Sequence, residues 1–248
     1  MFTELDETLI QAIEEAGFTE PTAVQEATLE LALDGHDLFV SAETGSGKTA
    51  AYLLPTFDRI LTEEGGEILA LVLVPTRELA QQVLKQAKQL ARFTSLKLGH
   101  IGGGTDIHKQ TDMIKNPPHF LVATPGRLLE LLARGLVELG EVNTLVLDEA
   151  DRLLDMGFSE DILAIAEHCS HRQQTQLYSA TLANKGLRGL ADQLMDEPTV
   201  IELNKTTDVH TSIEKQVIFS DDKGHKYEQL CWLLKNEEYR HSWQTQCR

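Results

Sequence analysis

The sequence predicts an α/β fold, an open parallel sheet with helices on both faces. Short apolar runs alternate with longer amphipathic stretches, as strands alternate with helices in such a fold. The longest apolar run, Ile68 to Val74, is too short to cross a membrane and is typical of a parallel strand buried on both faces. Polar or glycine-rich clusters follow the apolar runs, and parallel strands bring such clusters to one edge. We therefore expect a ligand site along that edge.

The chain begins with a segment, residues 1–20, whose apolar side chains fall on one face of a helix that Gly17 is placed to end. Pro21 interrupts the chain, and Thr22 can cap a second helix near 22–33. The strands expected after it are 38–40, 68–74, 96–101, 119–123, 143–147, 175–178 and 199–203. The helices expected between them are 48–63, one that ends near Phe93, 105–115, 127–134, 159–168 and 184–195.

After residue 205 this alternation ends. The length of 248 residues allows one large domain or two small ones. We expect a domain at 1–205, followed at 206–248 by a linker, a strand near 217–219 and a short helix near 226–234.

The net charge of −17, from 22 basic and 39 acidic residues, argues on average against binding of nucleic acid, because phosphate binding requires a basic face. A local basic patch can still exist within an acidic surface. The three cysteines and nine histidines match no metal-binding spacing, and such cysteines favour a reducing, cytoplasmic setting. The N-terminus lacks the segments of a signal peptide, so we expect no membrane association.

The segment Ser-Ala-Glu-Thr-Gly-Ser-Gly-Lys-Thr, residues 41–49, predicts a phosphate-binding loop between a strand and a helix. Glycines let backbone N–H groups point at an anion, and the helix N-terminus adds partial positive charge. Lys48 can reach the β- and γ-phosphates, and the Thr49 hydroxyl can bind Mg²⁺. Ala42 stands where the general pattern has glycine, and it is small enough for a close approach. The alternative is a glycine turn followed by an unrelated lysine, which the flanking elements disfavour.

Asp148 and Glu149 follow the expected strand 143–147. An aspartate at such a strand end can hold Mg²⁺ through the water around the ion, and the adjacent glutamate can activate a water that attacks the γ-phosphate. The alternative is an acidic turn that caps the next helix.

Further clusters lie at other strand ends. They are Pro75-Thr76-Arg77, Gly102-Gly103, Thr124-Pro125-Gly126-Arg127 and Ser179-Ala180-Thr181. Thr124 can cap a helix with Pro125 at its first position, which leaves free N–H groups that, with Arg127, suit a backbone phosphate. Taken singly, Arg77 and Arg127 could be solvated charges, and the glycines a plain turn.

In this order the motifs resemble those of DEAD-box RNA helicases. The matching segments are 42–49, 75–80, 124–127, 148–151 and 179–181, and Gly17 to Gln25 resembles the adenine-reading glutamine motif of the family. The resemblance covers residues 1–205 and implies a RecA-like ATP-binding lobe of the phosphate-loop NTPase class, with the glutamine motif within 1–33. It is similar in particular to bacterial members that act in ribosome assembly.

The resemblance implies roles for the matching residues. Gln25 would read adenine beside Phe18, with Phe2 as a candidate second aromatic. ATP would be held by Ala42, Glu43, Thr44, Gly45, Ser46, Gly47, Lys48 and Thr49. Thr49 and, through water, Asp148 would hold Mg²⁺, and Glu149, Lys48 and Asp148 would be the catalytic residues. The RNA backbone would contact Pro75, Thr76, Arg77, Gly102, Gly103, Thr124, Pro125, Gly126 and Arg127. Asp151, Ser179 and Thr181 would couple ATP to the RNA.

Members of the family carry a second lobe whose arginines complete the ATP site, and nothing in 206–248 matches them. We therefore expect part of a longer helicase or a truncated product. Two functions stay open: the ATP-binding lobe of an RNA helicase, and, for this chain alone, a weak nucleotide- and RNA-binding module with negligible turnover. A DNA helicase or a phosphate-loop kinase is disfavoured by 148–151 together with Gln25. Ribonucleoprotein or ribosome-assembly partners are implied by the resemblance.

Overall fold

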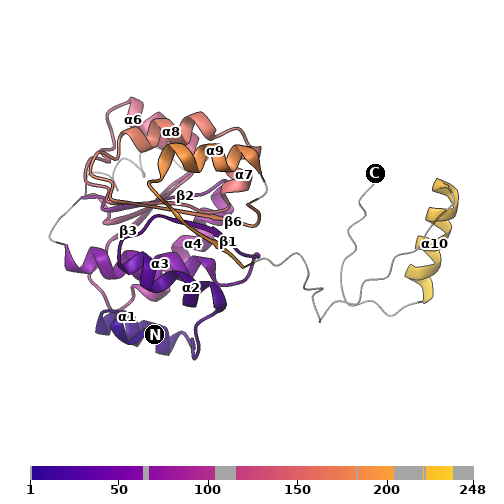
Figure 1. Ribbon diagram of the computed structural model, residues 1–248, viewed down its shortest axis with the longest axis horizontal. Helices are drawn as coiled ribbons and strands as arrows, with labels where there is room; N and C mark the ends of the chain where they lie inside the picture. The colour runs from indigo at the N-terminus through magenta and orange to yellow at the C-terminus, as the bar shows by residue number, and fades with distance from the viewer. Residues whose placement is uncertain are drawn as a thin grey trace. The chain divides into compact units, whose positions relative to one another are not determined.

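Figure 1 shows the computed structural model of the chain, which describes residues 2–63, 67–103, 116–182, 184–203, 220 and 222–236. Contacts between residues divide the chain into two compact units, Met1–Lys205 and Thr206–Arg248. The helix expected at 105–115 and the strand expected at 217–219 lie outside the described residues.

The first unit is built on a sheet. Seven strands of the described residues lie in the order β3-β4-β2-β5-β6-β1-β7, and each pairing of neighbours is parallel. The strands are β1 (Leu38–Ser41), β2 (Ala70–Leu73), β3 (Leu98–Ile101), β4 (Phe120–Ala123), β5 (Thr144–Leu147), β6 (Gln174–Ser179) and β7 (Thr199–Glu202). This arrangement confirms the predicted parallel sheet.

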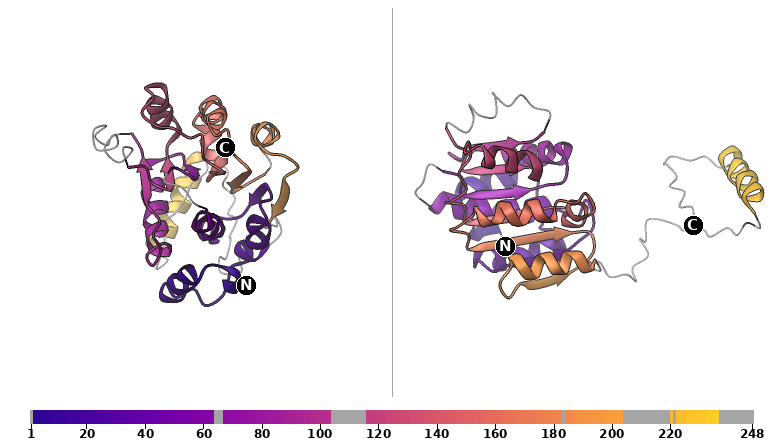
Figure 2. Two further views of the ribbon diagram at one scale, coloured as in Figure 1. Left: turned by 90° about the vertical axis from the view of Figure 1, so that its left-hand side faces the viewer. Right: turned by 90° about the horizontal axis from the view of Figure 1, so that it is seen from above.

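Helices cover both faces of the sheet (Figure 1). One face carries α1 (Glu7–Glu15), α2 (Ala23–Leu33), α3 (Lys48–Thr62) and α4 (Arg77–Leu90). The opposite face carries α6 (Pro125–Ala133), α7 (Ala150–Asp155), α8 (Ser159–Glu167) and α9 (Lys185–Leu194). Figure 2 shows α6, α8 and α9 side by side across the strands. The predicted two-sided covering of the sheet is therefore confirmed.

The core consists of two apolar layers separated by the sheet. Val72 and Val146 belong to the layer that packs against α1 to α4, whereas the adjacent Leu71 and Leu145 belong to the layer under α6 to α9. Successive side chains of a strand point to opposite faces, so a strand covered on both sides is apolar throughout. This explains why β1, β2, β4 and β5 are buried along their whole length.

The N-terminal helix is shorter than predicted. A 3₁₀ helix, η1 (Phe2–Glu4), comes first, and α1 begins after Asp6, whose carboxylate accepts a hydrogen bond from the Thr8 backbone N–H. Gly17 follows α1 with φ of 77°, the left-handed conformation that ends many helices. The predicted end at Gly17 is therefore confirmed, whereas the predicted start was wrong, because α1 begins only at Glu7.

Other helices also differ from the prediction. Helix α6 begins at Pro125, since proline suits the first helical position, and α4 ends at Leu90. Helix α7 was not predicted, because its six residues are too few to show a helical period.

The described part of the second unit contains the helix α10 (Lys223–Asn236), which includes the segment predicted as helical at 226–234. The side chains of Tyr227 and Trp232 on it are exposed. No helix in the described residues is long and apolar enough to span a lipid bilayer.

Candidate functional site

The register of the sheet brings the carboxyl ends of its strands to one edge. Ser41 pairs with Ser179, and Leu73 pairs with both Ala123 and Leu147. One residue further on, the Asp148 N–H donates to the Leu73 carbonyl oxygen at 3.0 Å. The segments that follow these strands therefore lie next to one another, although they are far apart in the sequence.

The loop between β1 and α3 has the backbone of an anion cradle. Gly45 and Gly47 have φ of 84° and 96°, a left-handed conformation that only glycine adopts without cost. A β-carbon on Gly47 would lie 2.8 Å from both Gln25 Nε2 and Thr22 Oγ1, so no other residue fits there. Helix α3 begins at Lys48, and the N–H groups of its first turn add partial positive charge.

The polar side chains of this loop suit a phosphate group. Lys48 Nζ donates to the carbonyl oxygens of Ala42 and Glu43, at 2.5 and 3.2 Å. Burial lowers the pKa of Lys48, and the charge of Asp148 opposes that shift. Among the described residues, the buried Ser46 hydroxyl has no hydrogen-bond partner. An anion in the cradle would give Lys48 a partner of opposite charge and the Ser46 hydroxyl an acceptor.

Asp148 is 3% exposed and lies at the end of β5. Its Oδ1 accepts from the Glu149 N–H at 2.9 Å, and its Oδ2 accepts from the Tyr52 hydroxyl at 2.9 Å. Burial raises the pKa of Asp148 to about 6, while the Tyr52 hydrogen bond and the charge of Lys48 act in the opposite direction. A cation nearby would favour the ionised carboxylate further.

The donor set around Asp148 fits Mg²⁺. Within the described ranges, no group of three or more His, Cys, Asp or Glu side chains could hold a metal ion by itself. Mg²⁺ is commonly held by one or two protein oxygens, by substrate phosphates and by water. Asp148, directly after β5, and Thr49, in the first turn of α3, supply oxygens of that kind.

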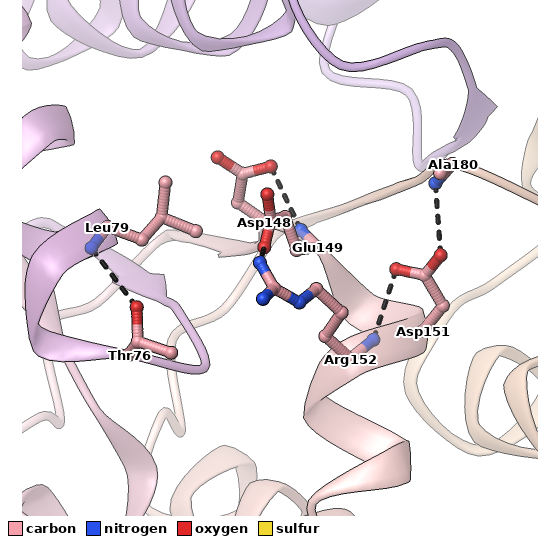
Figure 3. A network of polar contacts seen from close by, with 7 residues as sticks. All are labelled: Thr76, Leu79, Asp148, Glu149, Asp151, Arg152 and Ala180. Atoms are coloured by element: carbon pink, nitrogen blue, oxygen red, sulfur yellow. Dashed lines mark hydrogen bonds and ion pairs between the residues drawn. The ribbon is translucent and has the colours of Figure 1, made fainter. Parts of the chain in front are cut away.

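Glu149 connects β5 to α7 in a left-handed backbone conformation, with φ of 50°. Its carboxylate forms an ion pair with the Arg152 guanidinium at 2.5 Å (Figure 3). Glu149 is mostly buried, while Arg152 is exposed. Arg152 therefore competes with water for the oxygens of Glu149.

Asp151 joins α7 to the segment after β6. Its Oδ2 accepts from the Ala180 N–H at 3.3 Å, and its Oδ1 accepts from the Arg152 N–H at 3.1 Å (Figure 3). The Ser179 hydroxyl donates to the Thr181 carbonyl oxygen at 2.8 Å. Asp151 therefore binds the backbone of Ala180, the residue between Ser179 and Thr181.

Gln25 is buried and joins α2 to the phosphate loop. Its Oε1 accepts from the Thr22 N–H at 3.0 Å, and its Nε2 donates to the Gly47 carbonyl oxygen at 3.2 Å. Gln25 is therefore held by the protein and is not a solvated side chain. Phe2 and Phe18 are partly buried against the apolar layer beneath α1 to α4.

A cavity of about 440 Å³ lies over the N-termini of α4 and α6. It is lined by Pro75, Thr76, Arg77, Glu78, Gly103, Thr124, Gly126, Arg127, Glu130, Met156 and Phe158. Arg77 Nη1 donates to the Gly103 carbonyl oxygen at 2.9 Å, and Arg127 forms an ion pair with Glu130 at 3.4 Å. Gly102 and Pro125 are outside this lining. Gly102 lies against the Arg77 side chain, and Pro125 is buried.

Sequence reasoning missed several residues of this edge. Tyr52, Arg152, Met156 and Phe158 all contact a predicted segment or line the cavity. Arg152 could have been found from its place three residues after Glu149 on a helix. Tyr52 gave no such signal, because its partner Asp148 is 96 positions away.

Comparison with known proteins gives consistent matches. The family described as "DEAD/DEAH box helicase" matches residues 22–189. The chain is 42% identical to the ATP-dependent RNA helicase SrmB of Escherichia coli, over 95% of this chain and 54% of that protein. It is 39% identical to the DEAD-box ATP-dependent RNA helicase CshA of Streptococcus pneumoniae, over 91% of this chain and 43% of that protein.

A solved structure is also similar. The crystal structure of a hypothetical ATP-dependent RNA helicase from Sulfolobus tokodaii superposes with a TM-score of 0.74 and 36% identity, covering 80% of this chain and 57% of that one. The chain thus spans about half the length of the curated relatives that it matches.

Proposed function

The chain belongs to the DEAD/DEAH box helicase family, and we propose on that premise that it is the ATP-binding lobe of an ATP-dependent RNA helicase. Together with a second lobe it would hydrolyse ATP and separate or remodel short RNA duplexes. The observation that supports this most is the meeting, at one edge of the sheet, of an anion cradle, a buried aspartate and a cavity with two arginines.

In this proposal the loop at 42–49 holds the phosphates of ATP. Backbone N–H groups and the Ser46 hydroxyl would donate to phosphate oxygens, and Lys48 would exchange its two carbonyl acceptors for the β- and γ-phosphates. Gln25, which touches Gly47, would read adenine by sharing its amide between the loop and the base. Phe18 would lie beside the base.

Bound Mg²⁺ would neutralise the charge that develops on the phosphates. Thr49 and, through water, Asp148 would hold the ion. Glu149 would orient the attacking water and accept its proton once its carboxylate is released from Arg152.

The cavity over α4 and α6 would hold the RNA backbone. Two helix N-termini point into it, and Arg77 and Arg127 add positive charge there. Such contacts go to phosphate and sugar, so little sequence preference is expected. Asp151 on α7, with Ser179 and Thr181 at the end of β6, would couple RNA binding to the ATP site.

For this chain by itself, we propose weak binding and little turnover. An arginine supplied to the transferred phosphate can be worth about 10³–10⁵ in rate, and no such arginine is assigned here. Residues 206–248 would be the linker and the start of the second lobe. A cytoplasmic location and ribosome-assembly partners belong to the same proposal.

Calorimetric titration with ADP and with GDP, each with Mg²⁺, tests the nucleotide site. ADP is expected to bind more tightly, because the Gln25 amide matches adenine. Equal affinities would remove the base-reading role. For the two-lobe protein, the ATPase rate should rise with RNA and less with DNA, and stimulation by DNA alone would contradict an RNA helicase.

A further inference from the structure

Tyr52 is a buried side chain to which neither the sequence pattern nor the proposed mechanism assigns a role. It lies on α3, one turn after Lys48, and is fully buried. Its ring packs against that of Tyr178 with centroids 5.4 Å apart. Packing on all sides therefore determines where its hydroxyl lies.

The Tyr52 hydroxyl binds one of the two groups proposed to hold magnesium, and it comes from the same helix as the other. It donates to Asp148 Oδ2 at 2.9 Å, and Thr49 lies three residues before Tyr52 on α3. A phenylalanine would fill the same space, so packing alone does not require this hydroxyl.

The Asp148 carboxylate is held through both of its oxygens. Oδ1 accepts from the Glu149 N–H, and Oδ2 accepts from Tyr52. Each oxygen keeps a further lone pair for a water bound to a cation. Because the Tyr52 hydroxyl is neutral, it orients the carboxylate without cancelling the negative charge that attracts Mg²⁺.

We propose that Tyr52 is a positioning residue of the magnesium site, whose hydroxyl keeps the Asp148 carboxylate turned toward the water around the ion. This inference depends on the proposed function, since it needs nucleotide and Mg²⁺ in the cradle. Residues that orient a metal-holding side chain commonly change metal affinity by about 10–100-fold when they are removed.

The test measures how strongly Mg²⁺ tightens ADP binding to the 248-residue chain. ADP is titrated by calorimetry in MgCl₂ and in EDTA, and the ratio of the two affinities is compared for the wild type and Tyr52→Phe. The ratio should fall about tenfold in Tyr52→Phe, while the affinity in EDTA stays as in the wild type. A purely structural role would change both affinities together.

Tyr178→Phe is the matched control. This variant also loses one buried hydroxyl, but that hydroxyl donates to Gln176 Oε1 at 3.0 Å and not to Asp148. Its affinity ratio should equal that of the wild type. Thermal unfolding of both variants confirms that each is folded at the temperature of the titration.

The outcomes separate the inference from the function on which it depends. If Tyr52→Phe has the same affinity ratio as the wild type, Tyr52 does not position Asp148. The same conclusion follows if Tyr178→Phe lowers the ratio by an equal amount. Both results leave the proposed magnesium site intact. If Mg²⁺ does not change the ADP affinity of the wild type, the proposed magnesium site is wrong, and so is the role of Tyr52.

Discussion

Two ionisable residues at the edge of the sheet, Lys48 and Asp148, are bound by neutral groups of the protein among the described residues. Among the described residues, the hydrogen-bond partners of the buried Lys48 are carbonyl oxygens, and those of the buried Asp148 are neutral donors. Burial lowers the pKa of Lys48 and raises that of Asp148, which favours the neutral form of each side chain. The charge of the other residue opposes each shift. A bound phosphate beside Lys48 and a bound cation beside Asp148 would both relieve this cost.

Replacing Lys48 by alanine should therefore remove most nucleotide binding. Charge-assisted hydrogen bonds are worth about 1.5–3 kcal/mol each, so losing one or two lowers affinity by about 10-fold to more than 100-fold. Calorimetry with ADP and Mg²⁺ measures this change. Lys85→Ala, an exposed lysine on α4, is the control and should bind as the wild type does. Normal binding by Lys48→Ala would show that the phosphates lie elsewhere.

Glu149→Gln should keep nucleotide binding and stop turnover in the two-lobe protein, because glutamine cannot accept the proton of the attacking water. Its lost ion pair with the exposed Arg152 should cost little stability. RNA-stimulated ATP hydrolysis and ADP titration are the two measurements. Glu141→Gln, which removes an exposed carboxylate paired with His171, should have no effect on either. If Glu149→Gln hydrolyses ATP at the normal rate, another group is the base.

At the scale of elements, two helix N-termini meet at one cavity. The Thr76 hydroxyl caps α4 by accepting from the Leu79 N–H at 3.2 Å, while α6 begins at Pro125, whose fixed φ suits a first helical position (Figure 3 shows the cap of α4). Thr124 stands at the start of α6 without a side-chain cap hydrogen bond. The free N–H groups of both helices and two arginines thus face the same space.

Replacing Arg77 and Arg127 together by alanine should weaken RNA binding similarly for all sequences. If each arginine contacts one phosphate, the salt slope of log K should flatten by about 1.4, since each contact to a single strand contributes about 0.7. Fluorescence anisotropy with short RNAs across a salt series measures both, and ADP affinity should stay unchanged. The double variant Arg92→Ala and Arg188→Ala removes the same charge from exposed positions on other surfaces and should bind RNA as the wild type does. Unchanged, sequence-selective RNA binding by the first variant would place the RNA on another surface.

At the scale of the whole molecule, the described sheet and its two apolar layers all belong to the first unit. All strands of the described sheet and both apolar layers lie before residue 205. The net charge of −17 gives no general attraction to RNA, so binding must come from local donors. Weak, salt-sensitive binding is the expected behaviour.

A chain that ends at Lys205 should therefore unfold in one transition, with a midpoint within about 2 °C of the first transition of the full chain, a shift worth about 1 kcal/mol or less for a domain of this size. Its ADP affinity should also be unchanged. Calorimetric scans of the two chains provide the comparison. A midpoint lower by about 10 °C would show that 206–248 contributes to the stability of the first unit.

Local patterns were sufficient for the order and type of most elements. The apolar run from Ile68 to Val74 identified a buried strand, and Gly45, Gly47 and Lys48 identified the turn into α3, because each depends on backbone geometry set by near neighbours. Helix ends were less certain, as α1 shows, because a cap such as Asp6 competes with an apolar pattern that continues past it.

What the sequence determined by itself was the parallel α/β fold and the segments that gather at one edge, since strand direction and motif order follow from local signals. Only the tertiary structure decided which side chains meet across that edge. Tyr52 with Asp148, Arg77 with Gly103 and Asp151 with Ala180 are each far apart in the chain. Such contacts depend on which strands become neighbours and on how helices pack over them, which no periodicity along one segment records.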